Sequence, residues 1–375
     1  MRTSNIVWRS QELKCHRKAA AWLKPVAWCI VLALLTGSGS TAGSLASASR
    51  ILVIAPHPDD ETLGAGGLIY TACRRGAQVK VVFMTMGDGS GAAAGILFGT
   101  GQPSPDHMIA LGYRRHGEAV AALAALGVVG EDAVFLGYPD GGLADIVDDR
   151  HWGADEPYTS KHTAHASNPY ASSLTPGAEY CISRIASDLA MVFADYMPDL
   201  VLVPHPLDTH GDHWASYALT MYAIEQQNYV ELAGANVLAY MVHAGADWPQ
   251  PWGYRPDLPL DPSRWRGSPQ AVWIRTALTE DAVAAKLRAL ERYKSQLASV
   301  SAFLKSFVRS NELFSSVPVI DLASRNESGP AHEDHALLGR PDPRPFRVLP
   351  PSGEIRSVVA NRTKDGIAVT ATPAW

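Results

Sequence analysis

Short apolar runs alternate with amphipathic segments along most of the chain. Runs rich in Val, Ile and Leu, typical of buried strands, cover 51–56, 79–85, 133–137 and 200–204. Segments between them carry apolar residues at helical spacing and predict helices at 66–76, 114–127 and 181–197. Near-continuous apolar strands separated by helices indicate a parallel sheet covered on both faces. The pattern therefore predicts an α/β domain with a doubly wound, mostly parallel, Rossmann-like sheet.

The pattern is less regular in the second half. Apolar runs at 237–243 and 271–276 predict two more strands. Residues 279–308 predict one long helix, with Thr279 as its N-cap. Residues 138–178 are rich in Asp, His, Ser, Pro and Gly and predict a long loop, of the kind that forms a lid or a substrate wall. After about residue 318 the periodicity fades, which predicts an extended segment or a small β appendage.

The first 48 residues have the order of a secretory signal. Six Lys and Arg and one acid precede the apolar run Val26–Leu35, and small residues follow up to Ala46-Ser47-Ala48. We predict a cleaved signal peptide over 1–48 and a secreted or periplasmic protein. The alternative is a signal anchor that stays in the membrane. The apolar run is shorter than the ~20 residues of a spanning helix, so cleavage is favoured, with no membrane span in the mature chain.

Removal of the leader makes the chain acidic. It leaves 26 Lys and Arg against 36 Asp and Glu, a net charge of −10. An acidic secreted domain is a poor candidate for binding nucleic acid or an anionic membrane. Cys73 and Cys181 either pair in an oxidising compartment or remain two buried thiols, and the sequence leaves both open. The oligomeric state is equally open.

A polar cluster follows the first predicted strand. His57, Asp59, Asp60 and Glu61 come directly after Ile51–Pro56. In open α/β sheets, ligands bind outside the carboxyl ends of the strands. A histidine and a carboxylate three residues apart can bind one metal ion in a tight turn. The alternative is a polar loop in which one aspartate caps the next helix.

A second cluster follows the strand at 200–204. It contains three histidines and two aspartates: His205, Asp208, His210, Asp212 and His213. Because the carboxyl ends of parallel strands share one edge, both clusters are expected at the same place. Three protein ligands and one open position are typical of catalytic zinc. Five scattered histidines are interpreted as loop or structural residues: His107, His151, His162, His165 and His243.

Competing motifs are weak. The glycine-rich stretches "GAGG" (64–67) and "GDGSG" (87–91) have neither the dinucleotide-binding pattern nor a P-loop lysine. The chain also lacks the G-x-S-x-G elbow of a serine hydrolase. Metal-dependent chemistry is therefore the best interpretation of the two clusters.

The sequence "APHPDDETLGAGG", followed later by "PHPLDTHGDHWA", resembles the PIG-L (LmbE-like) family of zinc-dependent N-deacetylases. The stretches "YRRHGEAVAALAALGV", "FLGYPDGGL" and "KLRALERYKSQ" are also similar to family segments. The similarity covers roughly 50–315. It implies a catalytic domain over 49–318 and a C-terminal extension over 319–375.

The resemblance implies a metal site and a base. His57, Asp60 and His213 would bind Zn²⁺ or another divalent metal, and Asp59 would be the general base. Bound zinc lowers the pKa of water to about 7. A carboxylate beside that water can accept its proton and pass it to the leaving amine.

The remaining implied roles concern the substrate. His210 would stabilise the oxyanion and Asp212 would hold His210 in place, while Arg115 and Asp140 would contact the sugar. Asp212 could also raise the pKa of His210 and keep it charged; a neutral His210 with another acid is the alternative. Residues 208–209 stand where some relatives have a tyrosine that assists catalysis, so the group that supplements His210 is left open.

We therefore expect a secreted, zinc-dependent hydrolase that removes the N-acetyl group from an amino sugar. Its partner would be a small molecule or an oligosaccharide, such as an N-acetylglucosamine glycoconjugate. One alternative is a metal-dependent amidase acting on a non-sugar N-acyl compound. Another is a carbohydrate-binding protein without catalysis, although pure binding has no need of a base beside an open metal position.

Overall fold

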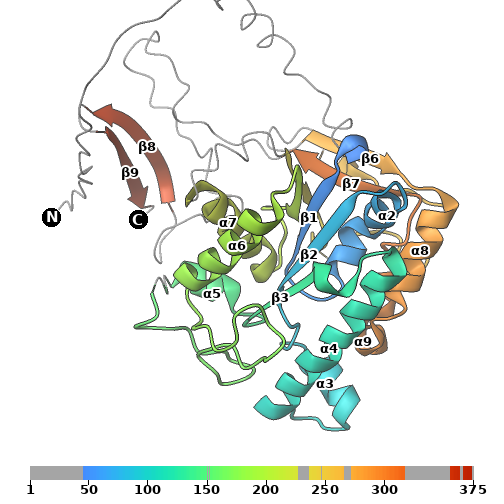
Figure 1. Ribbon diagram of the computed structural model, residues 1–375, viewed down its shortest axis with the longest axis horizontal. Coiled ribbons are helices and arrows are strands. Elements are labelled where there is room, and N and C mark those ends of the chain that lie inside the picture. The colour runs from blue at the N-terminus through green and yellow to red at the C-terminus, as the bar shows by residue number, and fades with distance from the viewer. Residues whose placement is uncertain are drawn as a thin grey trace, which may run out of the picture. The chain divides into compact units, whose positions relative to one another are not determined.

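Seven strands form one sheet in the order β3-β2-β1-β4-β5-β7-β6 (Figure 1). The computed structural model describes residues 45–316 and 355–373, apart from 150, 152, 227–235, 246, 266–271 and 364–365. The strands are β1 (Arg50–Ala55), β2 (Gln78–Thr85), β3 (Ala133–Tyr138), β4 (Leu200–Pro204), β5 (Asn236–Tyr240), β6 (Val272–Ala277) and β7 (Asn311–Ser316). Strands β1 to β5 pair in parallel, whereas β7 is antiparallel to β5 and β6. The predicted mostly parallel sheet is confirmed.

Helices cover both faces of the sheet (Figure 1). One layer holds α2 (Asp60–Arg74), α4 (Pro105–Leu126) and α8 (Glu280–Leu290), and the other holds α5 (Leu143–Asp148), α6 (Ile182–Tyr196) and α7 (Gly211–Gln226). Strand β1 serves both cores, because its side chains alternate. Ile51, Val53 and Ala55 pack in the first core, and Leu52 and Ile54 in the second. The doubly wound arrangement is therefore confirmed.

The strand order places a topological switch point between β1 and β4. The chain moves to one side for β2 and β3 and returns to the other side of β1 for β4 and β5. The connections diverge at this point and leave room beyond the carboxyl ends of the two strands. The two polar clusters follow these two strands directly, so the fold brings them to one place.

Helix boundaries differ from the predictions in three places. The helix expected at 114–127 starts earlier, at Pro105. The helix expected at 66–76 starts at Asp60, so the polar cluster forms its first turn. The single helix expected at 279–308 is wrong: α8 ends at Leu290 and α9 (Lys294–Lys305) begins after a turn. Tyr293 lies at this break, and its buried side chain turns inward to α2. The N-cap role of Thr279 is confirmed, because its side chain accepts from the Ala282 amide.

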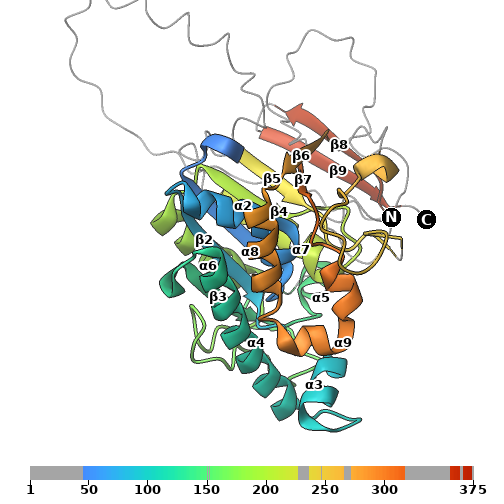
Figure 2. The same cartoon turned by 90° about the vertical axis from the view of Figure 1, so that its right-hand side faces the viewer.

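Helices α3 (Gly91–Phe98), α5 and α7 and strand β7 were not predicted. Helix α7 contains the second polar cluster in its first turn, strand β7 is inserted between β5 and β6, and α3 follows the loop after β2. Helices α3 and α9 lie side by side at one end of the domain (Figure 2). The long loop expected at 138–178 begins with the short helix α5 and is otherwise irregular where the structure describes it.

Most of the leader lies outside the described residues, so the signal peptide stays a prediction. Leu45 and Ala48 are buried, and Arg75 donates to the Ala48 carbonyl at 2.6 Å, so cleavage after Ala48 would remove a packed segment.

In the C-terminal extension, β8 (Ile355–Thr363) and β9 (Gly366–Pro373) form an antiparallel hairpin. Cys73 and Cys181 are both free thiols.

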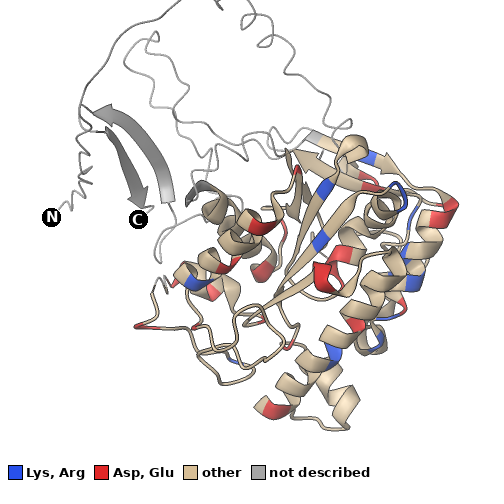
Figure 3. Ribbon diagram, viewed as in Figure 1, with Lys and Arg blue, Asp and Glu red and all other residues tan. Residues whose placement is uncertain are grey.

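Acidic and basic positions are interspersed over the helices (Figure 3). Among the described residues, no helix combines the length and apolar character that a membrane span requires.

A buried ion pair joins the last strand to α2. Lys286 of α8 donates to Glu312 of β7 at 2.7 Å and to the Leu63 carbonyl at 2.8 Å. Glu312 also accepts from the amides of Gly67 and Leu68, both at 2.8 Å. Neither charged side chain is more than 1% exposed. The C-terminal part of the domain therefore fixes the helix whose first turn carries the first polar cluster.

We predict that Lys286→Met lowers the free energy of unfolding by about 3–5 kcal/mol, because it leaves a buried carboxylate without its cation. Denaturant unfolding measures this. The control is Lys161→Met, which breaks an ion pair of an exposed lysine with Asp145 and should leave the unfolding midpoint nearly unchanged. A similarly small change in both variants would show that the buried pair does not stabilise the domain.

Candidate metal centre and active site

Two histidine rings converge on one carboxylate oxygen at the switch point. Asp60 Oδ2 lies 3.0 Å from His57 Nδ1 and 3.1 Å from His213 Nε2. All three side chains are buried, and His213 Nε2 makes no hydrogen bond of good geometry. The structure thus brings together the three residues that the sequence predicted as metal ligands, one pair from the loop into α2 and the third from the first turn of α7.

The outward-facing nitrogens of both rings are held by carboxylates. His57 Nε2 lies 3.0 Å from Asp212 and 3.2 Å from Asp140. His213 Nδ1 lies 3.0 Å from Asp208, which also accepts from the amides of Val242 and His243. A carboxylate on the far nitrogen fixes the tautomer and orientation of a metal-binding histidine. Each ring therefore presents its other nitrogen to Asp60 in a fixed orientation.

The charge of this cluster fits a cation. Although burial lowers the pKa of His213, Asp208 and Asp60 raise it to about 10. Burial also lowers the pKa of His57, yet Asp140, Asp212 and Asp60 raise it well above 6.5. Surrounding carboxylates thus favour positive charge at both rings. Imidazole nitrogen and carboxylate oxygen are ligands for Zn²⁺ and similar ions. The buried His213 Nε2, which lies near Asp60 without a hydrogen bond of good geometry, and this donor set both fit a divalent metal.

Asp59 lies next to these residues in a strained conformation. Its φ of 135° is far from the values that L-residues usually adopt, at a cost of roughly 1–3 kcal/mol. Burial raises the pKa of its carboxyl group to about 8, although Arg115, whose Nη2 is 3.3 Å from Oδ2, lowers it. The backbone amide of Asp59 donates to Glu61. The surroundings therefore hold a proton-accepting group in one orientation beside the metal centre.

Arg115 has a different environment from the one implied by the resemblance. It is only 3% exposed and donates to the carbonyls of Gly87 and Pro58 as well as to Asp59. Its contacts in the structure are with the loops around the base, so contact with the sugar stays a prediction. Asp140 lies within the site, where it accepts from the Gly89 amide and contacts His57.

Asp212 contacts His210 through its backbone amide and not through its carboxylate. The Asp212 carboxylate accepts from His57 and from the amides of Gly141 and Leu143 instead. Only the backbone amide of Asp212 reaches His210, and it donates to Nδ1 at 3.2 Å. Burial and the neighbouring His57 and His213 lower the pKa of His210, and the expected upward effect of Asp212 is present but smaller. Because Nδ1 of His210 accepts a hydrogen bond, the proton of the neutral ring is on Nε2. Together with the lowered pKa, this favours a neutral His210 over a charged one.

Two site residues were missed by the sequence analysis. His243, interpreted as a loop or structural residue, has its ring 4.8 Å from that of His213 and 5.1 Å from that of His210. Together with Asp60 and His213 it forms one of three groups of converging donor atoms among the described residues; the other two are His57 with His210 and His213, and His57 with Asp140 and Asp212. Asp208 was named in the second polar cluster without a role, and in the structure it contacts His213 Nδ1. His243 could have been found, because it follows β5, whose carboxyl end is at the same edge as those of β1 and β4.

A further contact comes from the C-terminal helices. The Tyr293 hydroxyl donates to Glu61 at 2.5 Å, and burial raises the pKa of Glu61 to about 7. The same carboxylate accepts from the amide of Asp59. The turn between α8 and α9 therefore supports the residue proposed as base, through a contact that no local motif predicts.

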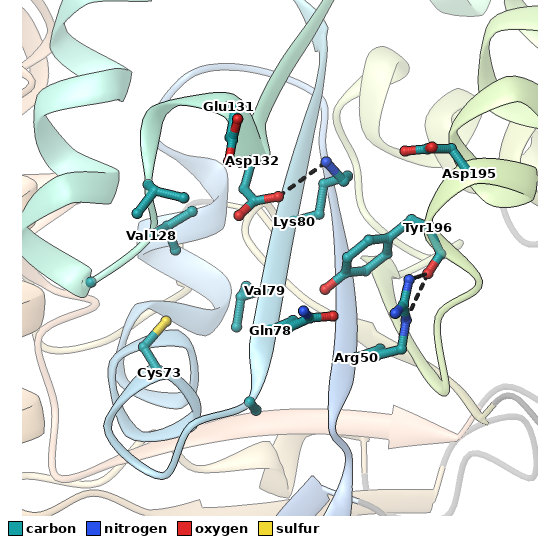
Figure 4. Close-up of a pocket in the computed structure, with 13 residues that line it drawn as sticks. Arg50, Cys73, Gln78, Val79, Lys80, Val128, Glu131, Asp132, Asp195 and Tyr196 are labelled. Atoms are coloured by element: carbon teal, nitrogen blue, oxygen red, sulfur yellow. Dashed lines mark hydrogen bonds and ion pairs between the residues drawn. The ribbon is translucent and has the colours of Figure 1, made fainter.

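A cavity of about 380 Å³ lies at the opposite, amino ends of β1 and β2 (Figure 4). Lys80 pairs there with Asp132 at 3.1 Å, and Arg50 donates to the Tyr196 carbonyl. The two cationic side chains that line the cavity, Lys80 and Arg50, thus already have partners. It contains none of the predicted site residues, so the cavity and the chemical site are at different ends of the strands.

A family model described as "PIG-L: GlcNAc-PI de-N-acetylase" matches residues 52–224. A Mycobacterium sp. (strain KMS) protein named 1D-myo-inositol 2-acetamido-2-deoxy-alpha-D-glucopyranoside deacetylase is 32% identical over 186 residues. That alignment covers 48% of this chain and 51% of the relative. A protein of the same name from Mycolicibacterium gilvum is 46% identical over 79 residues, which is 21% of this chain and 27% of the relative. The chain thus spans about half the length of the first of these relatives.

Two solved structures are also similar to the chain. The A40926 pseudoaglycone deacetylase Dbv21 has a TM-score of 0.47 and 19% identity, with 72% of this chain and 97% of that chain covered. The N,N'-diacetylchitobiose deacetylase from Pyrococcus horikoshii has a TM-score of 0.44 and 19% identity, with 72% and 84% covered.

We predict that Asp59→Asn stabilises the metal-free protein increasingly as the pH rises from 4 to 8. The folded state raises the pKa of this carboxyl from 3.8 to about 8. Over that range the wild-type native state therefore binds more protons than the unfolded state, and its stability falls with pH. The Asp59→Asn variant lacks this pH-dependent loss of stability, which is at most about 1.4 kcal/mol per pH unit. Unfolding with a chelator present measures it; a stability difference that is constant with pH would contradict the assignment.

We predict that Asp208→Asn weakens metal binding about 10- to 100-fold, because the His213 ring loses the carboxylate that orients it. Competition with a chromophoric chelator measures the affinity. Asp132→Asn, at the opposite ends of the strands, is the control and should bind metal like the wild type. Equal affinity in all three proteins would mean that Asp208 does not orient a ligand.

Proposed function

Because residues 52–224 form a PIG-L family domain, we propose that the protein is a metal-dependent hydrolase that removes the N-acetyl group from an amino sugar. The observation that carries the proposal is the convergence of His57 and His213 on Asp60, with Asp59 beside them. A site built only to bind sugar has no need of a strained, buried carboxylate next to a metal centre.

The metal would be held by His57 Nδ1, Asp60 and His213 Nε2, with Zn²⁺ as the best candidate for this donor set. When bound, such an ion supplies Lewis-acid activation of water and of the amide carbonyl. It also adds positive charge near Asp59, whose pKa burial raises to about 8 in the metal-free protein. That charge lowers the pKa of Asp59 and keeps it available as a base near neutral pH.

The chain's own residues move the protons. Asp59 accepts a proton from the attacking water, the C–N bond breaks after addition to the carbonyl, and Asp59 returns the proton to the amine. The products are acetate and the free amino sugar. His210 presents Nε2–H to the carbonyl oxygen as negative charge develops there, and one such donor is typically worth about 3–4 kcal/mol. Arg115 holds the Asp59 carboxylate and its loop in place during both transfers.

The substrate class follows from the relatives. The curated proteins that match are named as deacetylases of a 2-acetamido-2-deoxy-glucopyranoside, which supports an N-acetylglucosamine unit as the group that is hydrolysed. The acidic character of the chain outside the leader is consistent with a neutral sugar that becomes cationic as the amine is released.

We predict that the zinc-loaded full chain releases acetate from N-acetylglucosamine glycosides and that Asp59→Asn lowers kcat about 10²–10⁴-fold while the metal content is retained. His213→Ala should lose both metal and activity, and Asp145→Asn, a surface variant, should keep both. Acetate assays and metal analysis on the same samples measure this, with N-acetyl amino acids as the comparison substrates. Full activity after chelation, or preference for the amino acids, would contradict the proposal.

A further inference from the structure

Trp252 is a half-exposed aromatic side chain on a firmly held loop. Its side chain is 47% exposed, yet the backbone of the residues before and after it is held by hydrogen bonds. The fully buried Arg309 donates to the Pro251 carbonyl at 2.6 Å, and the Gly253 amide donates to the Ala302 carbonyl of α9 at 3.0 Å. An isolated exposed apolar residue needs no explanation. A large ring displayed from a fixed backbone, by contrast, is preorganised to contact something outside the protein.

A continuous row of rings links Trp252 to the metal centre. Trp252 meets Phe303 edge to face at 6.3 Å between centroids, and Phe303 stacks on His243 at 5.4 Å. His243 in turn lies 5.1 Å from His210, the predicted oxyanion donor. The loop that carries Trp252 leaves β5 at the edge where both polar clusters lie and runs beside α9 (Figure 2). The row therefore runs from His210, the predicted oxyanion donor, to the solvent-exposed ring of Trp252.

The position of Trp252 in this row indicates what it can contact. A sugar whose acetamido group reached the metal centre would lie nearest to His210 and His243 in this row. Trp252 is two ring contacts beyond His243. The C–H faces of a pyranose pack well on a flat indole, and the indole N–H can donate a hydrogen bond to a hydroxyl group. A single sugar would thus contact only His210 and His243, whereas a second ring attached to it would reach Trp252.

We propose that Trp252 is a specificity-determining residue that binds the second six-membered, polyhydroxylated ring of the substrate. This inference rests on the proposed function, since it assumes that an acetamido sugar is hydrolysed at the metal centre. It makes the preferred substrate a disaccharide or a longer glycoconjugate rather than a free amino sugar. Trp252 contributes binding energy remote from the reacting bond, so its removal acts on KM rather than on kcat.

The chain offers a matched control. Tyr254 lies two residues away and is 43% exposed, but it has no ring contact with the row among the described residues. Tyr254→Ala removes a similar exposed aromatic ring from the same loop and should not change the preference for two-ring substrates. Trp252→Phe keeps a flat ring at the position and should restore most of the preference that Trp252→Ala loses.

The test compares a methyl N-acetylglucosaminide with N,N'-diacetylchitobiose in the metal-loaded full chain. Trp252→Ala is expected to raise KM for the disaccharide about 5- to 10-fold at nearly unchanged kcat, and to leave KM for the monosaccharide within about twofold. The disaccharide's Kd should change by the same factor in the Asp59→Asn background, where turnover does not intervene. Unchanged unfolding midpoints in all variants show that the loop is intact.

Equal effects on both substrates, or no effect on either, would overturn the role of Trp252 in binding a second sugar ring. In either of those results the wild type still releases acetate, so the proposed function stands. If the wild type releases acetate from neither sugar, the proposed function itself fails. The wild-type acetate measurement therefore separates the two failures.

Discussion

The site depends on one oxygen atom, Asp60 Oδ2, on which two imidazole nitrogens converge from different parts of the chain. His57 comes from the loop after β1 and His213 from the first turn of α7, so both must be placed to within a fraction of an ångström. Parallel pairing of β1 with β4 supplies the coarse position, because it puts the two loops at one switch point. Carboxylates on the outer ring nitrogens supply the fine orientation.

This arrangement concentrates negative charge where water is excluded. Asp59, Asp60, Asp140, Asp208 and Asp212 are all buried within one small region. The guanidinium of Arg115 and the amides that donate to these carboxylates offset part of that charge, and raised histidine pKa values show the excess that remains. A divalent cation offsets it more fully than protons do. In the proposed function, metal binding and ionisation of Asp59 would both follow from this excess of negative charge. The strain at Asp59 is tolerated because the surrounding contacts outweigh it.

The sequence analysis succeeded where local patterns carry the information. Apolar runs located six of the seven sheet strands, and the position of both polar clusters after parallel strands predicted one shared site, which the structure contains. It missed contacts between residues that are distant in sequence. Tyr293, at the break before α9, reaches Glu61, and the side-chain partner of Asp212 is His57 rather than its near neighbour His210. Strand β7 was missed because its short run, "NELFSS", has weak alternation and is specified by pairing with β5 and β6.

The central claim is that the two clusters build a single metal centre at the carboxyl ends of β1 and β4. Anomalous scattering from crystals of the zinc-loaded protein, measured on both sides of the zinc absorption edge, locates the ion without reference to activity. The account predicts one strong peak in contact with His57, Asp60 and His213. A principal peak elsewhere, such as beside Lys80 and Asp132 at the opposite ends of the strands, or a peak that survives replacement of His213 by alanine, would contradict it.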